Sequence, residues 1–188
     1  LTSDGTNWAS TAAAGGGAWN LIGTAVASTS ASLTVTGLDA TYDTYAIALS
    51  ALHPSVDNSV PYMRVGDSNG IHSGGSDYRY HCQHSTHSTA SYDANISAGA
   101  SSVRIGTGMG SATGEGYGGL FYLHRPADAL VYPIVSGTFT SLDLNTVLNV
   151  GNVHFSRLSL ISLDRIQFYF NNGNIDSGRM TIYGISHT

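Results

Sequence analysis

The stretch from Tyr78 to His87, YRYHCQHSTH, gathers three of the chain's eight histidines and its single cysteine. Imidazole nitrogens and thiolates are the ligands that zinc prefers in proteins. His81, His84 and His87 are therefore candidate metal ligands, with Cys82 beside them. A closed zinc site usually takes its ligands in spaced pairs, whereas a site shared around a symmetry axis needs only one or two ligands from each chain.

Strand geometry argues against a single-chain metal site in this stretch. Successive side chains of a strand point to opposite faces, so His81 and Cys82 cannot both reach one ion. The alternation instead places Tyr78, Tyr80 and Cys82 on one face, where a small thiol is ordinary core filling. We expect a core strand over 77–83, an exposed loop that carries the next two histidines, and no cofactor.

Two further motifs match catalytic signatures by letter only. Gly66 to Gly70 reads G-x-S-x-G, the nucleophile elbow of α/β-hydrolases, which requires a helix after the serine. Gly114 to Gly119 reads G-x-G-x-x-G, which binds dinucleotides only where a helix begins. Turn-forming residues follow the first motif, and the strand-like run LFYL follows the second. We interpret the first motif as a β-turn and the second as part of a glycine-rich surface loop.

Paired carboxylates, which glycoside hydrolysis requires, are not indicated by the sequence. The only glutamate, Glu115, stands alone in the glycine-rich loop, and most aspartates fall at positions that suit turns. We expect turn-forming roles for five of them: Asp39, Asp43, Asp57, Asp67 and Asp176. The sequence therefore predicts no catalytic residues, and we expect a protein that is not an enzyme.

Composition predicts the type of secondary structure. The chain has 188 residues, with 23 glycines, 11 tyrosines, a single glutamate and no lysine, since all seven basic residues are arginine. Glutamate and lysine are good helix formers, so their scarcity removes the usual material of solvated helix faces. Valine, isoleucine, threonine and tyrosine favour strands, and glycine supplies turns. The sequence predicts an all-β protein that is long enough to bury a core without disulfides.

Short apolar-rich runs separated by turn residues predict about ten or eleven short strands. In the run 43–52, Tyr45, Ile47 and Leu49 share one face, which is the period of two expected of a half-buried strand. Strands at this spacing predict an antiparallel two-sheet sandwich, jelly-roll-like in character. The expected strands cover residues 19–26, 31–37, 43–52, 60–65, 77–83, 101–105, 118–124, 129–139, 147–155, 163–170 and 178–185.

Two connections carry local signals. Asn171 to Asn174 predicts a hairpin connection between the last two strands, because Asn-Gly favours positive φ. Leu38 to Tyr42 is the best candidate for a single helical turn.

The first residues differ from the rest of the chain. Residues 1–18 are small, polar and glycine-rich, and we expect a connector from an upstream segment, with a flexible joint over 12–17. The chain begins with Leu1 rather than Met and has no signal core, which also favours an upstream segment. Strand-like runs begin at Trp19 and predict a single β-domain over 19–188.

Charge and hydropathy argue against two classes of partner. The formal net charge is −5 at pH 7 and basic residues are few, so we expect no nucleic acid as a partner. No run approaches the roughly 20 apolar residues of a membrane helix, so we expect no membrane insertion.

Several stretches resemble tail fibres and related virion proteins of tailed bacteriophages. The opening LTSDGTNW resembles a short segment that typically precedes a C-terminal domain in those proteins. The remainder resembles that C-terminal β-domain. The resemblance rests on GAWNLI (17–22), GLDATYDTY (37–45), GEGYGGLFYL (114–123) and NIDSGRMTIYGI (174–185). It implies a structural protein of the virion, most often a fibre tip or attachment module and commonly a homotrimer, and it brings no catalytic residues.

The leading hypothesis is a receptor-binding module at the C-terminal end of a tail fibre, which contacts the host cell surface. Loops on a rigid sandwich would present adaptable Tyr, Ser, Asn, His and Gly contacts to a host glycan or a protein receptor. Other virion proteins would bind through the N-terminal side. The expected contact residues lie in loops over 67–76, 84–99 and 106–118, and are Asp67, Asn69, His72, His84, His87, Tyr92, Glu115 and Tyr117.

Self-association is a separate expectation. The strands expected over 118–123 and 130–135 carry apolar residues on both faces. Both faces of such strands require cover, either from a second layer or from a neighbouring subunit. We therefore expect a homotrimer, as the resemblance implies.

Two other functions stay open. A capsid decoration or head-fibre protein would share this fold and bind other virion subunits, because a fold does not determine function. A glycan-degrading or deacetylating enzyme would depend on Ser68 or Glu115, although no constellation in the sequence meets the geometric requirements of such an enzyme.

Overall fold

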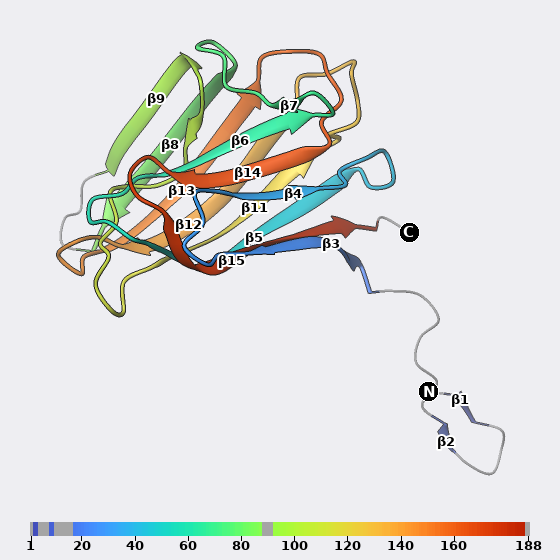
Figure 1. Ribbon diagram of the computed structural model, residues 1–188. Coiled ribbons are helices and arrows are strands. Elements are labelled where there is room, and N and C mark those ends of the chain that lie inside the picture. Colours follow the sequence, from blue (N-terminus) through green and yellow to red (C-terminus); the bar gives the residue numbers. More distant parts are fainter. Residues whose placement is uncertain (1, 4–7, 10–16, 88–91, 187–188) are drawn as a thin grey trace.

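The computed structural model describes residues 2–3, 8–9, 17–87 and 92–186, and within them the chain is all-β (Figure 1). Two antiparallel sheets pack face to face as a sandwich, which confirms the predicted fold class. The described residues form no helix, and therefore none that could cross a membrane.

The expected connector lies largely outside the described residues. Its described parts are Gly17, Ala18 and two short paired strands, β1 (Thr2–Ser3) and β2 (Trp8–Ala9).

The larger sheet has eight strands and the smaller sheet has five. In spatial order the larger sheet consists of β3 (Trp19–Val26), β15 (Ile175–Ile185), β5 (Thr44–Pro54), β11 (Tyr117–His124), β12 (Ile134–Leu142), β13 (Leu148–Arg157), β8 (Tyr78–Thr86) and β9 (Tyr92–Ala100). The smaller sheet consists of β10 (Val103–Arg104), β6 (Pro61–Asp67), β14 (Arg165–Phe170) and β4 (Leu33–Thr36), with the short β7 (Gly70–Ile71) paired to β6.

Eight of these strands have the connectivity of a jelly roll. The order β3-β15-β5-β11 in the larger sheet faces the order β4-β14-β6-β10 in the smaller one, so the chain repeatedly crosses from one sheet to the other. Two insertions then widen the larger sheet beyond this framework. The pair β8 and β9 is inserted between β6 and β10, and the pair β12 and β13 between β11 and β14. The four inserted strands form one continuous half of the larger sheet.

The core lies between the sheets and is formed by alternate residues, as the period of two predicts. Tyr45, Ile47 and Leu49 are buried on the inner face of β5. Ala51 has a positive φ of 50° and interrupts the alternation, so that Leu52 also points inward. The backbone beside it requires a glycine on β15, because a side chain on Gly178 would lie 2.4 Å from the carbonyl oxygen of Ala51.

Phenylalanine rings cover glycines across the inner face of the widened half. Phe121 on β11 is directly opposite Gly137 on β12, and Phe139 on β12 is directly opposite Gly151 on β13. A Cβ atom on Gly137 would lie 2.3 Å from the Phe121 ring, and one on Gly151 would lie 2.5 Å from the Phe139 ring. The rings lie against the backbone of the neighbouring strand, which only glycine permits.

The first and last strands of the sandwich, β3 and β15, bring the two ends of the chain together at one corner. Trp19 at the start of β3 pairs with Ile185 at the end of β15, and the amide of Ser186 donates to the carbonyl of Ala18 at 2.8 Å (Figure 1). The register continues from Ile185 through Thr44 on β5 to the last residue of β11. The glycine-rich loop before β11 therefore lies at the opposite end.

The strand predictions are confirmed for eleven of the thirteen strands of the two sheets and missed β7 and β9. The described residues of the segment over 84–99 are mostly strand rather than loop, because β8 continues to Thr86 and β9 pairs with it from Tyr92 onward. The strand expected over 129–139 begins only at Ile134, because an Asx turn at Asp128 holds the preceding segment. Leu130 in that segment is 86% exposed.

The hairpin predicted at Asn171 to Asn174 is wrong, although a turn does form there. Gly173 has the expected positive φ of 70°. However, β14 pairs only with strands of the smaller sheet and β15 only with strands of the larger one. The turn is therefore a crossover between sheets, a distinction that local turn chemistry does not encode.

We expect Gly137→Ala to lower the free energy of unfolding by about 2–3 kcal/mol, because the new methyl group overpacks the Phe121 ring and the backbone of β11. Gly75→Ala is the matched control, since no atom lies within 4 Å of the added Cβ, and it should change stability by no more than about 0.5 kcal/mol. Urea unfolding of both variants checks this. Equal stability of the two variants would contradict the proposed ring–glycine contact.

Candidate binding surface

Two residues expected to contact a partner belong to the core, and the structure corrects that expectation. Tyr117 is 1% exposed, and its hydroxyl donates to the carbonyl of Ile105 at 2.6 Å. Burial raises the pKa of this hydroxyl well above its usual range. His84 is also buried, on the same inner face of β8 as Cys82, and burial lowers the pKa of its imidazole. Strands rather than loops carry both residues.

A third expected contact residue, Glu115, is buried within its own loop. Its Oε2 accepts a hydrogen bond from the amide of Ala112 at 2.7 Å, and its carboxylate fills the space that a side chain on Gly110 would need. Nearby, Asp57 accepts two hydrogen bonds from Ser111, at 2.7 and 2.8 Å. The glycine-rich loop between β10 and β11 is therefore tightly folded, because two carboxylates bind its amides.

The candidate metal ligands do not come together. His81 lies on the outer side of β8 and His84 on the inner side, while Nδ1 of His87 accepts a hydrogen bond from the amide of Leu148 at 3.0 Å. Across the part of the chain that the structure describes, no three His, Cys, Asp or Glu side chains are grouped so that they could hold a metal ion. Cys82 is buried as predicted, and burial raises the pKa of its thiol to about 11.

The G-x-S-x-G motif forms the predicted turn. Asp67 pairs with Gly70 between β6 and β7, which leaves Ser68 and Asn69 as exposed turn residues. Asp67 Oδ1 accepts a hydrogen bond from the amide of Asn69 at 2.8 Å, and Asp67 Oδ2 lies 3.4 Å from Nε2 of His72. Asp67 thus contacts both of the other contact residues expected in this region.

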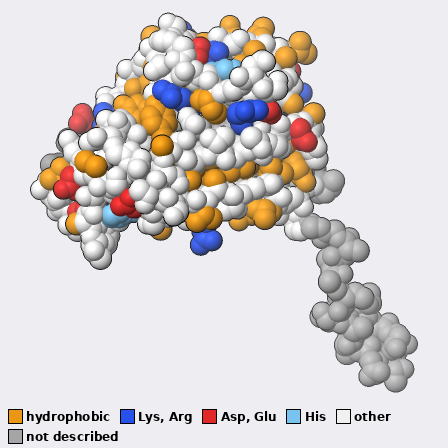
Figure 2. Space-filling view, in the orientation of Figure 1, with side chains coloured by type: hydrophobic (Ala, Val, Ile, Leu, Met, Phe, Trp, Pro, Cys, Tyr) orange, Lys and Arg blue, Asp and Glu red, His pale blue; other side chains and the backbone are white. Residues whose placement is uncertain are grey.

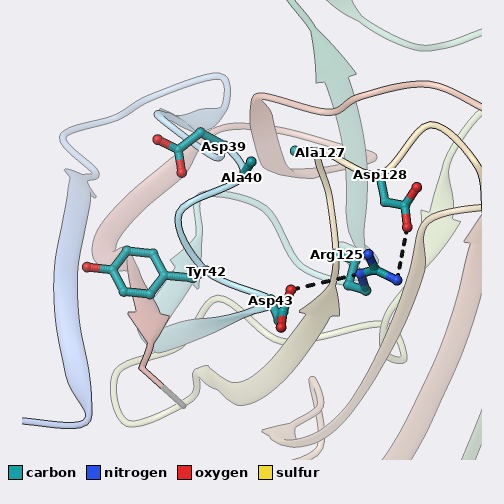
Figure 3. Close-up of a pocket in the computed structure, with 7 residues that line it drawn as sticks. All are labelled: Asp39, Ala40, Tyr42, Asp43, Arg125, Ala127 and Asp128. Carbon is teal, nitrogen blue, oxygen red and sulfur yellow. Dashed lines mark ion pairs between the residues drawn. The ribbon is translucent and has the colours of Figure 1, made fainter. Parts of the chain in front are cut away.

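A pocket of about 240 Å³ opens at the end of the sandwich where β4 leads into β5 and β11 leads into β12 (Figure 3). Arg125 lies across it, with Nη1 3.1 Å from Asp128 and Nε 3.8 Å from Asp43. The amide of Arg125 also donates to the carbonyl of Asp43 at 2.7 Å. The charged groups hold one loop to the other, so this pocket is a structural junction.

Asp39, on the other side of the pocket, organises the loop before β5. Its Oδ1 accepts hydrogen bonds from the amide of Thr41 at 2.8 Å and from the hydroxyl of Tyr45 at 2.7 Å. These bonds, the first above all, lower the pKa of the Asp39 carboxyl. They also explain why the helical turn predicted over 38–42 is absent, since the aspartate forms an Asx turn instead.

The outer face of the larger sheet is the most extensive candidate surface. Its register forms continuous rows of side chains across all eight strands. One row, which we call the histidine row, runs through Ile96, His81, His154, Ser136, Tyr122, Ala46, Tyr183 and Leu21. His154 is exposed and His81 is half-buried. His124 joins them, because its Nε2 lies 3.4 Å from Oγ of Ser136.

Two adjoining hollows form a groove beside the histidine row. One has a volume of about 400 Å³ and extends from Tyr122 to His154, and the other has about 350 Å³ and extends to Tyr92. They share Thr138 and Asn152. The groove crosses from β11 to β9, four strand spacings or about 19 Å. Its other polar lining includes Ser136, Thr140, Gln83 and Ser85.

Aromatic side chains stand at the two ends of this groove. Tyr92, an expected contact residue, is 74% exposed on β9. At the β11 end, Tyr122 is covered by Trp19, with ring centroids 6.5 Å apart, and Trp19 also contacts Tyr183 at 5.6 Å. Hydroxyls and amides, with Leu120 and Val150 among them, lie between these rings. Such a lining can hydrogen-bond and stack against a polyhydroxylated ligand.

The two outer faces of the sandwich differ in charge. Over β6 and β14, the near face in Figure 2 carries arginine and acidic side chains together, and Arg165 is paired with Asp164 at 2.6 Å. The eight strands of the larger sheet contain only two carboxylates. Asp93 is directly opposite the buried His84, and Asp176 is the second residue of β15, a strand that does not line the groove. The groove itself therefore contains no acidic side chain.

Comparison with protein-family models, with curated proteins and with solved structures found no match for this chain.

Sequence reasoning named Tyr92 and His84, which both line the groove, and named His81 as a candidate metal ligand, but it missed the rest of this surface. The groove residues come from β8, β11, β12 and β13, and Gln83, Asn152 and Thr138 become neighbours only through strand pairing. The available signal was the set of outward-facing positions on these strands. Their order in the sheet was needed to combine them.

The pKa of Asp39 gives a prediction about pH. Because the folded-state pKa is below the ordinary 3.8, Asp39 contributes stability that is complete above about pH 4 and is lost as the pH falls through the folded value. We expect Asp39→Asn to unfold with a shallower pH dependence between about pH 5 and 2. Some dependence should remain, since Asp57 and Asp67 have lowered pKa values as well. Identical pH profiles for wild type and variant would contradict this role.

Proposed function

We propose that this chain is an attachment module of a tailed-bacteriophage virion, a C-terminal tail-fibre domain that binds glycan on the host cell surface. The observation that carries the proposal is the groove on the outer face of the larger sheet. Its exposed Tyr92, the hydroxyls and amides in its mixed lining and its lack of carboxylates suit the recognition of sugars. The sequence resemblance to phage virion proteins supplies the biological setting.

The rigidity of the groove supports a binding role. All of its lining residues stand on paired strands, so their positions are fixed before a ligand arrives. Preorganised groups lose little conformational freedom on binding. A ligand of extended shape could contact several strands at once, which suits a surface polysaccharide.

Self-association is part of the proposal. Leu21 and Val26 are 64% and 69% exposed on β3, the edge strand of the larger sheet, and Trp19 is 44% exposed beside them. Leu21 and Val26 lie at the opposite side of the sheet from Tyr92, so contacts between copies would leave the Tyr92 end of the groove accessible, while Trp19, which covers Tyr122, would border its β11 end. We propose that three copies pack through this edge, with other virion proteins bound on the N-terminal side.

We expect the purified domain to bind surface polysaccharide from its host, and we expect Tyr92→Ala and Asn152→Ala each to weaken binding at least about fivefold. Tyr92 is exposed at one end of the groove and Asn152 lies in the shared part of its two hollows. Isothermal titration calorimetry measures both effects. Tyr132→Ala is the matched control, because Tyr132 is 51% exposed on a loop outside the groove.

Three results would contradict this proposal, and each would favour a different function or a different contact site. Binding to assembled capsids but not to cells would favour a capsid decoration or head-fibre protein. Turnover of polysaccharide that Ser68→Ala abolishes would favour an enzyme. Equal loss of binding in Tyr132→Ala and Tyr92→Ala would place the contact outside the groove.

The oligomeric state gives an independent prediction. Light scattering should give the mass of three chains for the wild type and of one chain for the double variant Leu21→Asp, Val26→Asp, because charges on an apolar interface are costly to desolvate. Leu160→Asp is the control, since Leu160 is 54% exposed on the loop before β14. A monomeric wild type would contradict the trimer and leave the glycan experiment unaffected.

A further inference from the structure

We propose that the histidine row makes the groove selective for acidic glycans, and that binding strengthens as the pH falls. The inference rests on the proposed function, because it names the class of glycan that the same groove takes. An acidic glycan is defined here by its chemistry: a repeating sugar that carries a carboxylate or a phosphodiester.

The geometry of the row brings two imidazoles together. His81 on β8 and His154 on β13 are directly opposite each other in the register and lie on the same outer face. Opposite residues of antiparallel strands have Cβ atoms about 4.5–5.5 Å apart. His154 also lines the groove. One anionic group at this edge can therefore contact both rings.

A third imidazole extends this basic edge. Nε2 of His124 lies 3.4 Å from Oγ of Ser136, and Ser136 is directly opposite His154. Arg79 stands two residues before His81 on the same face of β8, exposed and permanently charged. Three histidines, His81, His124 and His154, and one arginine, Arg79, thus lie along one side of the groove, which we call the histidine margin.

The groups that face this edge from the neighbouring strands are neutral. Ile96 on β9 is opposite His81, and Tyr122 on β11 is opposite Ser136. Beyond His124, Arg125 is held by Asp43 and Asp128 on the loops at the end of the sandwich. The remaining carboxylate in these strands, Asp93, is opposite the buried His84 and so belongs to the inner side.

The distribution of charge distinguishes this groove from the rest of the molecule. The chain as a whole has a formal charge of −5 with 12 acidic residues, yet the groove and its histidine margin have none. The net negative charge opposes the approach of an acidic polymer, and the groove lacks the carboxylates that would oppose it locally. Histidine is the side chain that gains charge between about pH 8 and 5, so acidification adds positive charge to the edge that an anionic sugar would contact.

The test uses the whole chain with two acidic probes, polygalacturonate and a teichoic acid, and with the carboxyl-reduced form of the first as its uncharged counterpart. EDTA in every buffer removes metal that the imidazoles could bind. We expect polygalacturonate or teichoic acid to bind about tenfold more tightly at pH 5.5 than at pH 7.5, and added salt to weaken the binding. The carboxyl-reduced polymer should show no such change.

Substitutions of single histidines test which side chains cause the pH dependence of binding. His81→Gln and His154→Gln should each reduce the pH dependence by at least half while leaving unfolding by urea nearly unchanged, because both side chains lie on the outer face of the sheet, where His154 is exposed and His81 is half-buried. His53→Gln is the matched control, since His53 lies at the end of β5, away from the row, with Nε2 3.2 Å from the carbonyl of Ala112. It should bind as the wild type does. Loss of pH dependence in His53→Gln as well would overturn the assignment.

The outcomes separate this inference from the proposed function. Equal binding of charged and reduced polymers at both pH values overturns acidic selectivity and leaves a glycan-binding module intact. Binding of only polygalacturonate, or of only the teichoic acid, supports the inference and identifies the acidic group. Binding of none of the three polymers overturns the inference, and the titration with host polysaccharide then decides the proposed function by itself.

Discussion

The contact on which the candidate surface depends is the packing of phenylalanine rings against glycine backbone between β11, β12 and β13. Phe121 lies against Gly137 and Phe139 against Gly151, on the side of the sheet that faces the core. Each ring occupies the place that a side chain on the opposite glycine would need, and Phe121 in this way joins β11 of the jelly-roll framework to β12, the first strand of the insertion. The opposite side of the same strands forms the groove. The ring–glycine packing thus lies directly behind the groove.

The acidic residues have a second organising role, because they are concentrated where the backbone turns. Asp39, Asp67, Asp128 and Asp143 each accept a hydrogen bond from an amide two residues later, and Glu115 does so for an amide three residues earlier. Placing carboxylates in turns leaves the strands of the larger sheet nearly free of them. The basic character of the groove margin thus follows from the way the loops are built.

Much of the fold could be predicted from the sequence, because local alternation determines strand positions and faces. Tyr45, Ile47 and Leu49 were expected on one face and are buried together, and Cys82 was expected in the core and is there. The site was largely beyond such reasoning. Neighbours such as His81 and His154 are 73 residues apart in sequence and meet only through strand order. His84 was misplaced because polar residues after Cys82 resemble a loop, although β8 continues through them.

The pairing of β3 with β15 has a mechanical consequence. β3 is an edge strand held on one side only, through seven paired positions between Trp19 and Val26. A pull applied to Ala18 along the direction of β3, while the groove is held by a ligand, loads the hydrogen bonds of this ladder together in shear. They would have to break nearly simultaneously for the sandwich to open, whereas a sideways pull would separate them one by one. The corner at which the chain enters is thus arranged to bear tension along the strands.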